Sequence, residues 1–503
     1  MNKTVGEREC RPFTDQPVLF AESPAGSLRI SASLGSMSSS TFMRTAQVLL
    51  VFTSLATGAF AQVNLAPTTG SNVLDGDSPH LLVTGLRPGE MATVHSFRKS
   101  MAYDPPNYTA VPLLAHAEAV FQADNKGRIS IDSAAPIHGT YTGIDPLGLL
   151  WSGTRLALDG STNLPVTQSV HLQSSTDILF RIEAPSLGVG KSVETVIHLT
   201  DGSDLLDIQT VSLSGLNGVF ARPKIKSSSP LPAIILLHGS EGGSNASARV
   251  TAIRFAQLGY AAFALNYFAW PGSSLDNVPQ ALVNIPVEDL ATVRTWLMAQ
   301  SNVDAQTLAI WGASKGAELA LVGAAHYGWI HRVVACVPSN AVWSGFGRPP
   351  AAGEVYSSWS IDGKGLPYIP YDNFQDALDR KVSSLFVHQR SLNKASPEQR
   401  VAARIPIERS DARFLLLAAT KDVMWPSATM TNDIEASLRA AHKESAVKAL
   451  IFPEASHFIC GTGSEPRRIN PVHKPEGDDP TPEADAHAVA TSWQETKAFL
   501  LQP

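Results

Sequence analysis

The residues best suited to chemistry in this chain are a serine, an aspartate and a histidine, each of which follows an apolar run. Ser314 is the centre of a Gly-x-Ser-x-Gly motif, residues 312–316. The apolar run 307–311 precedes the motif and the helix-forming run 317–322 follows it, which predicts a strand, a sharp turn and a helix. Because glycine has no Cβ, the two glycines of the motif allow a strained turn with the serine hydroxyl at the tip. We interpret Ser314 as a nucleophile; a glycine-rich loop is the alternative.

Asp422 and His457 complete a set of three. Asp422 follows the apolar run 414–418, and His457 follows the run that ends at Phe452. The carboxyl ends of parallel strands meet at one edge of a sheet, so the three side chains are predicted to meet there. His457 would take the proton of Ser314, and Asp422 would hold the imidazole in the required tautomer. Their order along the chain is that of α/β-hydrolases.

A serine nucleophile also needs two backbone donors for the oxyanion that forms during attack. One is predicted at the N–H of Lys315, directly after the nucleophile. The other is expected in the glycine-rich loop 238–243, where Ser240 and Glu241 are the candidates. A simple connection is the alternative for this loop. We expect the side chain of Lys315 to be solvated and give it no role.

Zinc binding is the competing chemistry in the C-terminal region. The residues that could supply ligands are His457, Cys460, His473 and His487. Their spacing fits no standard zinc pattern, and His457 already has a role in the triad. The sequence therefore predicts no metal site and no cofactor.

Two regions with different patterns must position these residues. From 62 to 220, short β-rich runs with period-two alternation predict an all-β, immunoglobulin-like antiparallel sandwich. From 221 to 503, continuous apolar runs between helices predict a mostly parallel sheet with helices on both faces, the α/β hydrolase fold. Residues 340–410 form an insertion whose length is typical of lids and binding loops.

The first 61 residues contain a segment that resembles a secretory signal. Arg44 precedes an apolar core at 46–56, and an Ala-x-Ala cleavage site ends at Ala61. The core is shorter than the roughly 20 residues that span a bilayer, so no stable membrane span is expected after signal removal. A buried helix is the alternative. We expect export to the periplasm or the exterior if the signal at 43–61 is used, and a cytoplasmic protein otherwise; Met37 or Met43 would be a more usual start.

The length, net charge and cysteine content of the chain limit its domain number and its possible binding partners. With 503 residues, the chain is long enough for two or three domains. Its net charge of −6 comes without a basic stripe, so no nucleic-acid partner is expected. Cys336 and Cys460 could pair in an oxidising compartment. The sequence favours two separate cysteines, because strand-end residues far apart in the chain rarely meet disulfide geometry.

These motifs resemble a known family, the acyl-CoA thioester hydrolases and bile-acid-CoA:amino acid N-acyltransferases. The similarity extends over residues 70–501. The matching segments are 138–152, 314–319, 405–409, 421–425 and 452–457. The resemblance implies a β-sandwich followed by an α/β-hydrolase domain, and attack on an activated acyl thioester.

The nucleophile separates the two branches of this family. The N-acyltransferases carry cysteine where this chain has Ser314. An acyl-cysteine is a thioester that amines attack readily, whereas an acyl-serine is an oxoester that water clears. The sequence therefore predicts a serine hydrolase that cleaves small-molecule acyl thioesters. The alternatives are an exported carboxylic ester hydrolase on the same fold, an acyl-CoA:amino acid N-acyltransferase, and a non-catalytic exported binding protein.

Overall fold

The computed structural model describes residues 62–104, 109–157, 171–213, 215–224, 229–275, 277–347, 356–467 and 480–502. The predicted leader and signal at 1–61 lie outside the described residues, as do His473 and residues 348–355 of the insertion. All the described residues belong to one compact unit.

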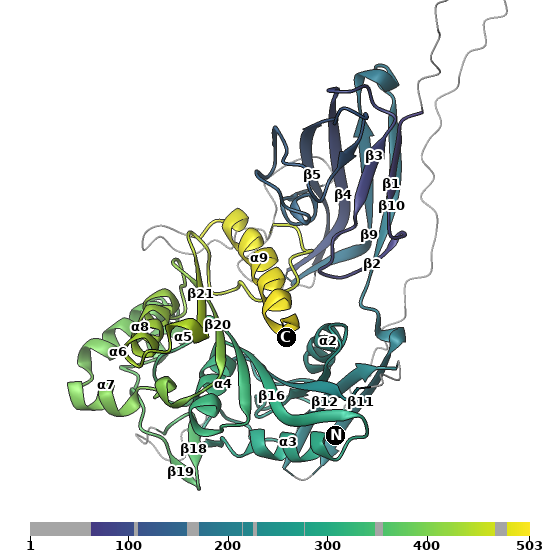
Figure 1. Cartoon of the computed structure of the whole chain (residues 1–503). Coiled ribbons are helices and arrows are strands. Elements are labelled where there is room, and N and C mark those ends of the chain that lie inside the picture. The colour runs from purple at the N-terminus through teal and green to yellow at the C-terminus, as the bar shows by residue number, and fades with distance from the viewer. Residues whose placement is uncertain are drawn as a thin grey trace, which may run out of the picture. The chain divides into compact units, whose positions relative to one another are not determined.

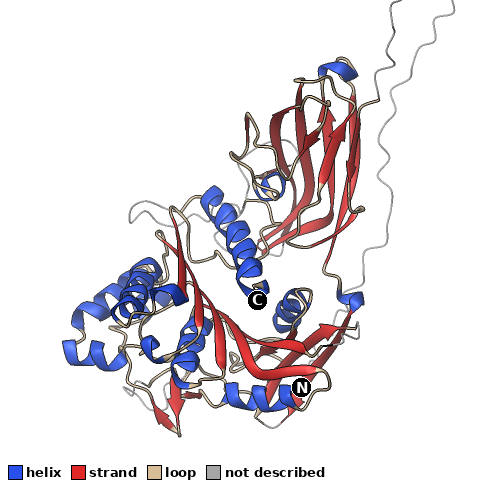
Figure 2. Ribbon diagram, in the orientation of Figure 1, coloured by secondary structure: helices blue, strands red, loops and turns tan. Residues whose placement is uncertain are grey.

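A large sheet dominates the C-terminal region (Figures 1 and 2). The strand order of this sheet is β11-β12-β14-β13-β16-β17-β20-β21. Its strands are β11 (Leu206–Leu213), β12 (Leu216–Pro223), β13 (Leu231–Leu237), β14 (Ala261–Leu265), β16 (Val303–Ala313), β17 (Ile330–Cys336), β20 (Arg413–Ala419) and β21 (Val447–Phe452). The strands from β14 to β21 pair in parallel, and β11 and β12 add an antiparallel edge. The prediction of a mostly parallel sheet is confirmed.

Helices cover both faces of this sheet, as predicted. On one face lie α3 (Asp289–Met298), α4 (Lys315–His326) and α8 (Ser427–Ala440), which share a core with Ile235 and Leu237 of β13. On the other lie α2 (Asn245–Ala256) and α9 (Pro482–Leu501), which share a core with Ile234 and Leu236. Successive residues of β13 are thus buried on opposite faces, which explains its continuous apolar sequence.

The N-terminal region is β-rich and contains two sheets (Figure 2). One has the order β1-β3-β6, and the other has the order β2-β10-β9-β4-β5-β7, with β8 paired to β5. Their strands are β1 (Asn64–Pro67), β2 (Asn72–Leu74), β3 (Leu81–Thr84), β4 (Met91–Asp104), β5 (Thr109–Gln122), β6 (Ile129–Ser130), β7 (His138–Gly139), β8 (Thr154–Ala157), β9 (His171–Glu183) and β10 (Ser192–Thr200). All their pairings are antiparallel except that of β2 with β10. The immunoglobulin-like description stays a prediction.

The large sheet begins earlier in the chain than the change of sequence pattern indicates. Strand β11 and most of β12 precede residue 221. These two strands form an antiparallel hairpin at the sheet edge, where one side of a strand is more exposed and the sequence alternates as it does in a sandwich. The change at residue 220 therefore falls inside β12, and the domain boundary placed there stays a prediction.

The insertion between β17 and β20 has its own short elements. They are β18 (Trp359–Ile361), β19 (Lys364–Gly365), α5 (Gln375–Leu378), α6 (Ser384–Lys394), α7 (Pro397–Ala403) and the 3-10 turn η3 (Ile407–Arg409). Strand β18 also pairs with β15 (Ile285–Pro286), which precedes α3. The insertion is thus fastened to the sheet domain by backbone hydrogen bonds.

The contacts that connect the β-rich region with the large-sheet domain include the ion pair between Arg254 of α2 and Asp75, and two further sets. Helix α9 contributes Ala486 and Ala490 to the apolar core of the β-rich region, and Trp493 to the core beside the large sheet. The buried guanidinium of Arg155, on β8, forms a 3.0 Å ion pair with Glu465. Both further sets involve the part of the chain that follows His457.

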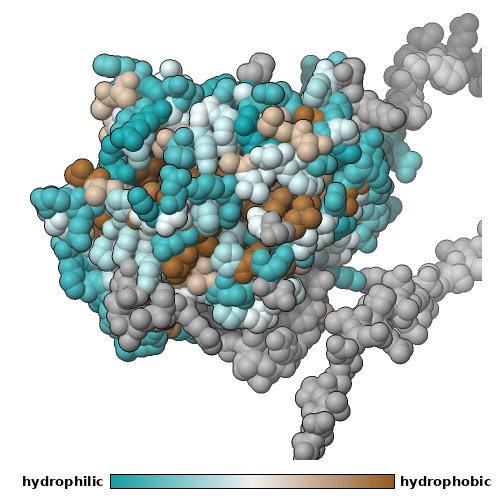
Figure 3. Space-filling view, turned by 90° about the horizontal axis from the view of Figure 1, so that it is seen from below, coloured by the Kyte–Doolittle hydropathy of each residue, from teal (hydrophilic) through white to brown (hydrophobic). Residues whose placement is uncertain are grey.

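The surface face in Figure 3 mixes hydrophilic residues with small groups of hydrophobic ones. Exposed large apolar side chains such as Met298, Leu378 and Val401 come from separate helices, which is normal for a folded protein. In the part of the chain that the structure describes, no helix has the length and apolar character needed to cross a bilayer.

Candidate active site

The Gly-x-Ser-x-Gly motif forms the predicted strand, turn and helix. Strand β16 ends at Ala313 and α4 begins at Lys315, with Ser314 between them at φ 55° and ψ −119°. An L-residue is strained at this positive φ, which is the conformation expected for an exposed nucleophile on a sharp turn. The backbone N–H of Ser314 donates to the carbonyl of Cys336, 2.9 Å away. A Cβ at position 316 would lie 2.5 Å from the Leu237 carbonyl oxygen, so only glycine lets α4 pack this closely on β13.

Asp422 and His457 are in direct contact. The Nδ1 of His457 lies 2.9 and 2.8 Å from the two carboxylate oxygens of Asp422. The backbone N–H groups of Met424 and Trp425 donate to Asp422 Oδ1, which fixes the carboxylate. Both members of the pair are buried. With Nδ1–H donating to the aspartate, Nε2 of His457 is left as the basic atom.

Ser314, Asp422 and His457 follow three strands, β16, β20 and β21, that lie within four adjacent positions of the sheet. All three residues are therefore at the same carboxyl edge. Within the described residues, no hydrogen bond joins Ser314 to His457. Such bonds are commonly long in unliganded hydrolases and tighten when substrate binds. The assignment of the three residues as a catalytic triad stays a prediction.

Cys336 and Cys460 form a disulfide, so the expectation of two separate cysteines is wrong. Their separation of 124 residues in sequence made the pairing improbable. Cys336 ends β17 beside the nucleophile turn, and Cys460 follows His457 by three residues. Because both Ser314 and His457 lie at this sheet edge, the chain brings the two cysteines together there. The bridge connects the strand that holds the Ser314 backbone to the loop that carries His457.

Replacing both Cys336 and Cys460 with serine is expected to lower the free energy of unfolding by about 2–5 kcal/mol, because the bridge closes a long loop. Turnover should also fall, since the loop that carries His457 loses its covalent attachment. Thermal unfolding with and without a thiol reductant measures the effect. Reductant should lower the Tm of the wild type and leave the Tm of the double variant unchanged. If the two proteins have the same Tm without reductant, the prediction is wrong.

The loop predicted to supply an oxyanion donor lies against the nucleophile. A Cβ at position 239 would come within 3.3 Å of Ser314 Cβ. Neither the backbone N–H of Lys315 nor those of Ser240 and Glu241 donate a hydrogen bond within the described part of the chain. The Glu241 carboxylate instead accepts the N–H of Gly239 at 2.9 Å. The three candidate donors remain available, and their role stays a prediction.

Aromatic side chains that the sequence did not single out hold this loop. The ring of His238 stacks on Tyr267 with centroids 4.0 Å apart, and the Tyr267 hydroxyl donates to the His238 carbonyl. Trp270 Nε1 donates to the Ser240 carbonyl at 3.0 Å. Tyr267 and Trp270 follow β14, the strand next to β13, so the loop is supported by its neighbour in the sheet.

The Lys315 side chain is buried, so the expectation that it is solvated is wrong. Its Nζ lies 3.0 and 2.8 Å from the two carboxylate oxygens of Glu318, one turn further along α4. Glu318 Oε1 also accepts hydrogen bonds from the Trp343 backbone N–H and from Trp359 Nε1. Burial lowers the pKa of Lys315 and raises that of Glu318, and the ion pair opposes both changes. The charged pair thus connects the nucleophile helix to the insertion.

His388 of α6 is a further buried group near the site that sequence reasoning missed. Its Nδ1 donates to the Ser384 carbonyl at 2.8 Å. Within the described residues, Nε2 has no hydrogen-bond partner. The ring packs against Trp343 and Trp425, and Trp425 in turn packs against His457. A histidine in a polar, aromatic-rich insertion gave no distinguishing signal in the sequence.

Burial lowers the pKa of His388 to about 4. In the unfolded chain the imidazole of His388 has a pKa of about 6.5. Between about pH 6.5 and pH 4 the unfolded chain therefore binds a proton that the folded chain does not, so the free energy of unfolding decreases as the pH falls through this range. The loss attributable to His388 is up to about 3 kcal/mol.

His388→Phe is therefore expected to weaken the dependence of the unfolding free energy on pH in this range. Urea unfolding at about pH 7 and about pH 5 measures it. His331→Phe, at an exposed position on β17, should keep the wild-type dependence. The prediction is wrong if His388→Phe and the wild type lose equal stability on acidification.

The residues weighed as zinc ligands are occupied in other ways where the structure describes them. His457 is bound to Asp422, Cys460 is in the disulfide, and the ring of His487 packs on Trp151 with centroids 5.3 Å apart. His473 lies outside the described residues.

The parallel sheet, the strained serine turn and the Asp–His pair at one sheet edge define an α/β hydrolase. Two family models match the sequence: "Acyl-CoA thioester hydrolase/BAAT N-terminal region" over residues 77–178 and "BAAT / Acyl-CoA thioester hydrolase C terminal" over residues 288–502. BAAT is the bile-acid-CoA:amino acid N-acyltransferase branch. The chain belongs to this family, and it is an enzyme of the hydrolase class.

Named relatives agree with this membership. The chain is 25% identical to acyl-coenzyme A thioesterase 1 of Rattus norvegicus, in an alignment that covers 77% of this chain and 86% of the relative. It is also 25% identical to the mitochondrial acyl-coenzyme A thioesterase 2 of Mus musculus, over 77% of this chain and 80% of the relative.

Among solved structures, a putative dienelactone hydrolase from Klebsiella pneumoniae aligns with a TM-score of 0.36 at 17% identity, over 59% of this chain and 99% of that chain. The acylaminoacyl peptidase of Pyrococcus horikoshii aligns with a TM-score of 0.37 at 11% identity, over 77% of this chain and 54% of that chain. The fold assignment rests on the strand order and pairing described above.

Proposed function

We propose that this chain is a serine hydrolase that cleaves acyl thioesters through an acyl-Ser314 intermediate. The observation that carries the proposal is the strained turn at Ser314, on the same sheet edge as the hydrogen-bonded Asp422–His457 pair. His457 takes the Ser314 proton as the hydroxyl attacks the acyl carbon. The thiolate leaves readily and takes up the proton from His457, and the neutral His457 then activates the water that releases the acid.

The N–H groups of Lys315 and of Ser240 or Glu241 are proposed to stabilise the oxyanion in both steps. Lys315 begins α4, so its N–H lies at the positive end of the helix dipole. Removing one such donor typically costs about 10²- to 10³-fold in kcat. The buried Lys315 charge lies on the same residue but is paired with Glu318, so only the backbone N–H is assigned to catalysis.

The experiment that tests the proposal compares two substrates with the same acyl chain, an acyl-CoA and a p-nitrophenyl ester, with and without glycine as an amine acceptor. A thioesterase gives the higher kcat/KM on acyl-CoA and releases free acid in the presence of glycine. Preference for the ester would support the carboxylic ester hydrolase, and an N-acyl glycine product would support the acyltransferase. The absence of labelling by a fluorophosphonate would support a binding protein.

We propose in addition that the chain is exported, by the signal at 43–61. The disulfide between Cys336 and Cys460 supports this, because disulfides persist mainly in oxidising compartments. An exported enzyme meets little acyl-CoA, so its substrate would then be another thioester or an ester of similar acyl group. N-terminal sequencing of the protein from its native host is the test. A mature form that begins after Ala61 is expected, and retention of residues before Met37 would rule export by this signal out.

A further inference from the structure

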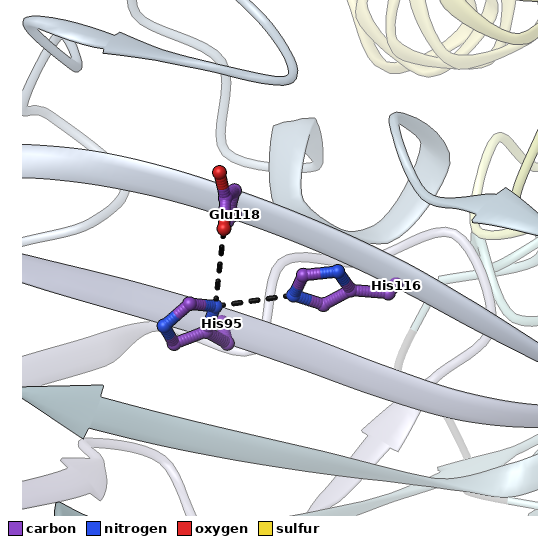
Figure 4. A group of neighbouring side chains, drawn as sticks. All are labelled: His95, His116 and Glu118. Atoms are coloured by element: carbon purple, nitrogen blue, oxygen red, sulfur yellow. Dashed lines mark hydrogen bonds and ion pairs between the residues drawn. The ribbon is translucent and has the colours of Figure 1, made fainter. Parts of the chain in front are cut away.

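One exposed face of the β-rich region carries two histidines and a glutamate side by side. Strands β4 and β5 pair antiparallel, and their side chains alternate between a buried face and a solvent face. Val94 and Ala117 are examples of the buried set. His95 and His116, both partly buried, and the exposed Glu118 belong to the opposite face, and Figure 4 shows the three side chains together.

The register brings the three side chains together. His95 is directly opposite Glu118, and His116 is two residues before Glu118 on the same face of β5. The Nδ1 of His95 lies 3.1 Å from Nε2 of His116 and 3.5 Å from Glu118 Oε2 (Figure 4). One potential ligand atom from each residue lies within 4.8 Å of the other two.

We propose that His95, His116 and Glu118 bind a divalent transition-metal ion, with Zn²⁺ as the preferred metal. Imidazole nitrogens and a carboxylate oxygen are established zinc ligands, at about 2.0–2.2 Å from the metal. In a tetrahedral site with such bonds, the ligand atoms lie about 3.3–3.5 Å from one another. The two measured separations are close to this value. Three protein ligands leave the fourth position to water.

The third separation, between His116 and the carboxylate of Glu118, can be shortened by movement of Glu118. Glu118 has a side chain that is 51% exposed, so its carboxylate can rotate toward His116 without displacing packed atoms. The rings are held more firmly. Phe97, on the same face of β4, stacks on His116 with centroids 4.7 Å apart and on His95 with centroids 5.9 Å apart.

The local charges are compatible with a bound cation. Metal ligation requires neutral imidazole, and the Glu118 carboxylate brings a negative charge to the three ligands. Arg181 of β9 is opposite His95 and brings a positive charge to this face. Its guanidinium is paired with Glu194 at 2.7 Å and lies over the Phe97 ring, so its charge is largely neutralised.

A hydrogen bond between the two rings is the metal-free interpretation of the same contact, with one ring donating to the other. The two interpretations differ in what happens when metal is supplied. The test uses the full chain without a polyhistidine tag, stripped with a chelator and then titrated with Zn²⁺. Bound metal is measured by calorimetry and by elemental analysis after dialysis.

The wild type is expected to bind one equivalent of Zn²⁺. The affinity of His95→Ala and of His116→Ala for Zn²⁺ should be at least about a hundredfold lower. Glu118→Gln should weaken binding as well, and because Glu118 is exposed, this variant preserves the fold. Co²⁺ in place of Zn²⁺ should give the intense visible absorption of a tetrahedral site, and the variants should lose it. Zn²⁺ should also raise the Tm of the wild type and leave the Tm of His95→Ala and of His116→Ala unchanged.

Matched controls come from two other histidine–carboxylate pairs of the β-rich region, which have no third His, Cys, Asp or Glu ligand among the residues that the structure describes. His80 contacts Asp132, and His198 contacts Asp177. His80→Ala and His198→Ala should keep the wild-type affinity for Zn²⁺. The proposal is overturned if the wild type retains no Zn²⁺, or if Glu118→Gln and His116→Ala both bind Zn²⁺ as the wild type does.

Discussion

Ser314→Ala is expected to reduce kcat for thioester hydrolysis by about 10⁴- to 10⁶-fold, the order of the losses that follow removal of a member of a serine triad. Without its hydroxyl no acyl-enzyme forms, and His457 has no proton to take. KM should change little, because the side chain that is removed contributes mainly to the transition state. The measurement is release of free thiol from an acyl-CoA under steady-state conditions.

Ser437→Ala, on the side of α8, is the matched control and should keep wild-type kcat. Circular dichroism shows whether each variant is folded. Retention of more than about a tenth of the wild-type kcat by a folded Ser314→Ala would reject the acyl-serine mechanism.

Ser314→Cys extends the same test to the choice between hydrolysis and transfer. It changes the acyl-enzyme from an oxoester to a thioester, which amines attack more readily. With glycine present, the ratio of N-acyl glycine to free acid should therefore rise relative to the wild type. An unchanged ratio would mean that the nucleophile does not determine the acceptor.

Glu318→Gln should lower the free energy of unfolding by about 3–5 kcal/mol, the usual cost of breaking a buried ion pair. The variant leaves the Lys315 ammonium buried without a compensating charge, one residue from the nucleophile. It also weakens the acceptor for Trp343 and Trp359, which attach the insertion to α4. Urea unfolding gives the loss of stability, and kcat should fall with it because the nucleophile turn is no longer held.

The control is the double variant Lys315→Met with Glu318→Gln, which removes both charges. Because an uncompensated charge costs more than the absence of a pair, the double variant should be more stable than Glu318→Gln alone. A single variant that loses less than about 1 kcal/mol would show that the pair contributes little.

Much of the large sheet could be predicted because its physical causes are local. Continuous apolar runs such as 233–237 mark buried parallel strands, and the glycines at 312 and 316 mark a turn with close backbone contacts. The positions of Asp422 and His457 follow from the same reasoning, since each is the first suitable residue after a buried strand. The structure brings those two into contact.

What the sequence could not reveal depends on contacts between distant segments. Lys315 was expected in solvent because lysine is rarely buried, and only the approach of Glu318 and the insertion makes its burial tolerable. The disulfide between Cys336 and Cys460 depends on where two loops meet. His388 lies in the insertion, whose path no periodicity specifies. The early start of the large sheet was hidden by the alternation of β11.

Helix α9 has a consequence for how the molecule unfolds. Its residues Ala486 and Ala490 complete one apolar core, and Trp493 and Phe499 complete another. Loss of structure in either core exposes part of the same helix and so weakens the other. We therefore expect the stability of the β-rich region and that of the large sheet to be coupled through α9. A destabilising change in the β-rich region, well away from Ser314, should for this reason shorten the lifetime of the active enzyme.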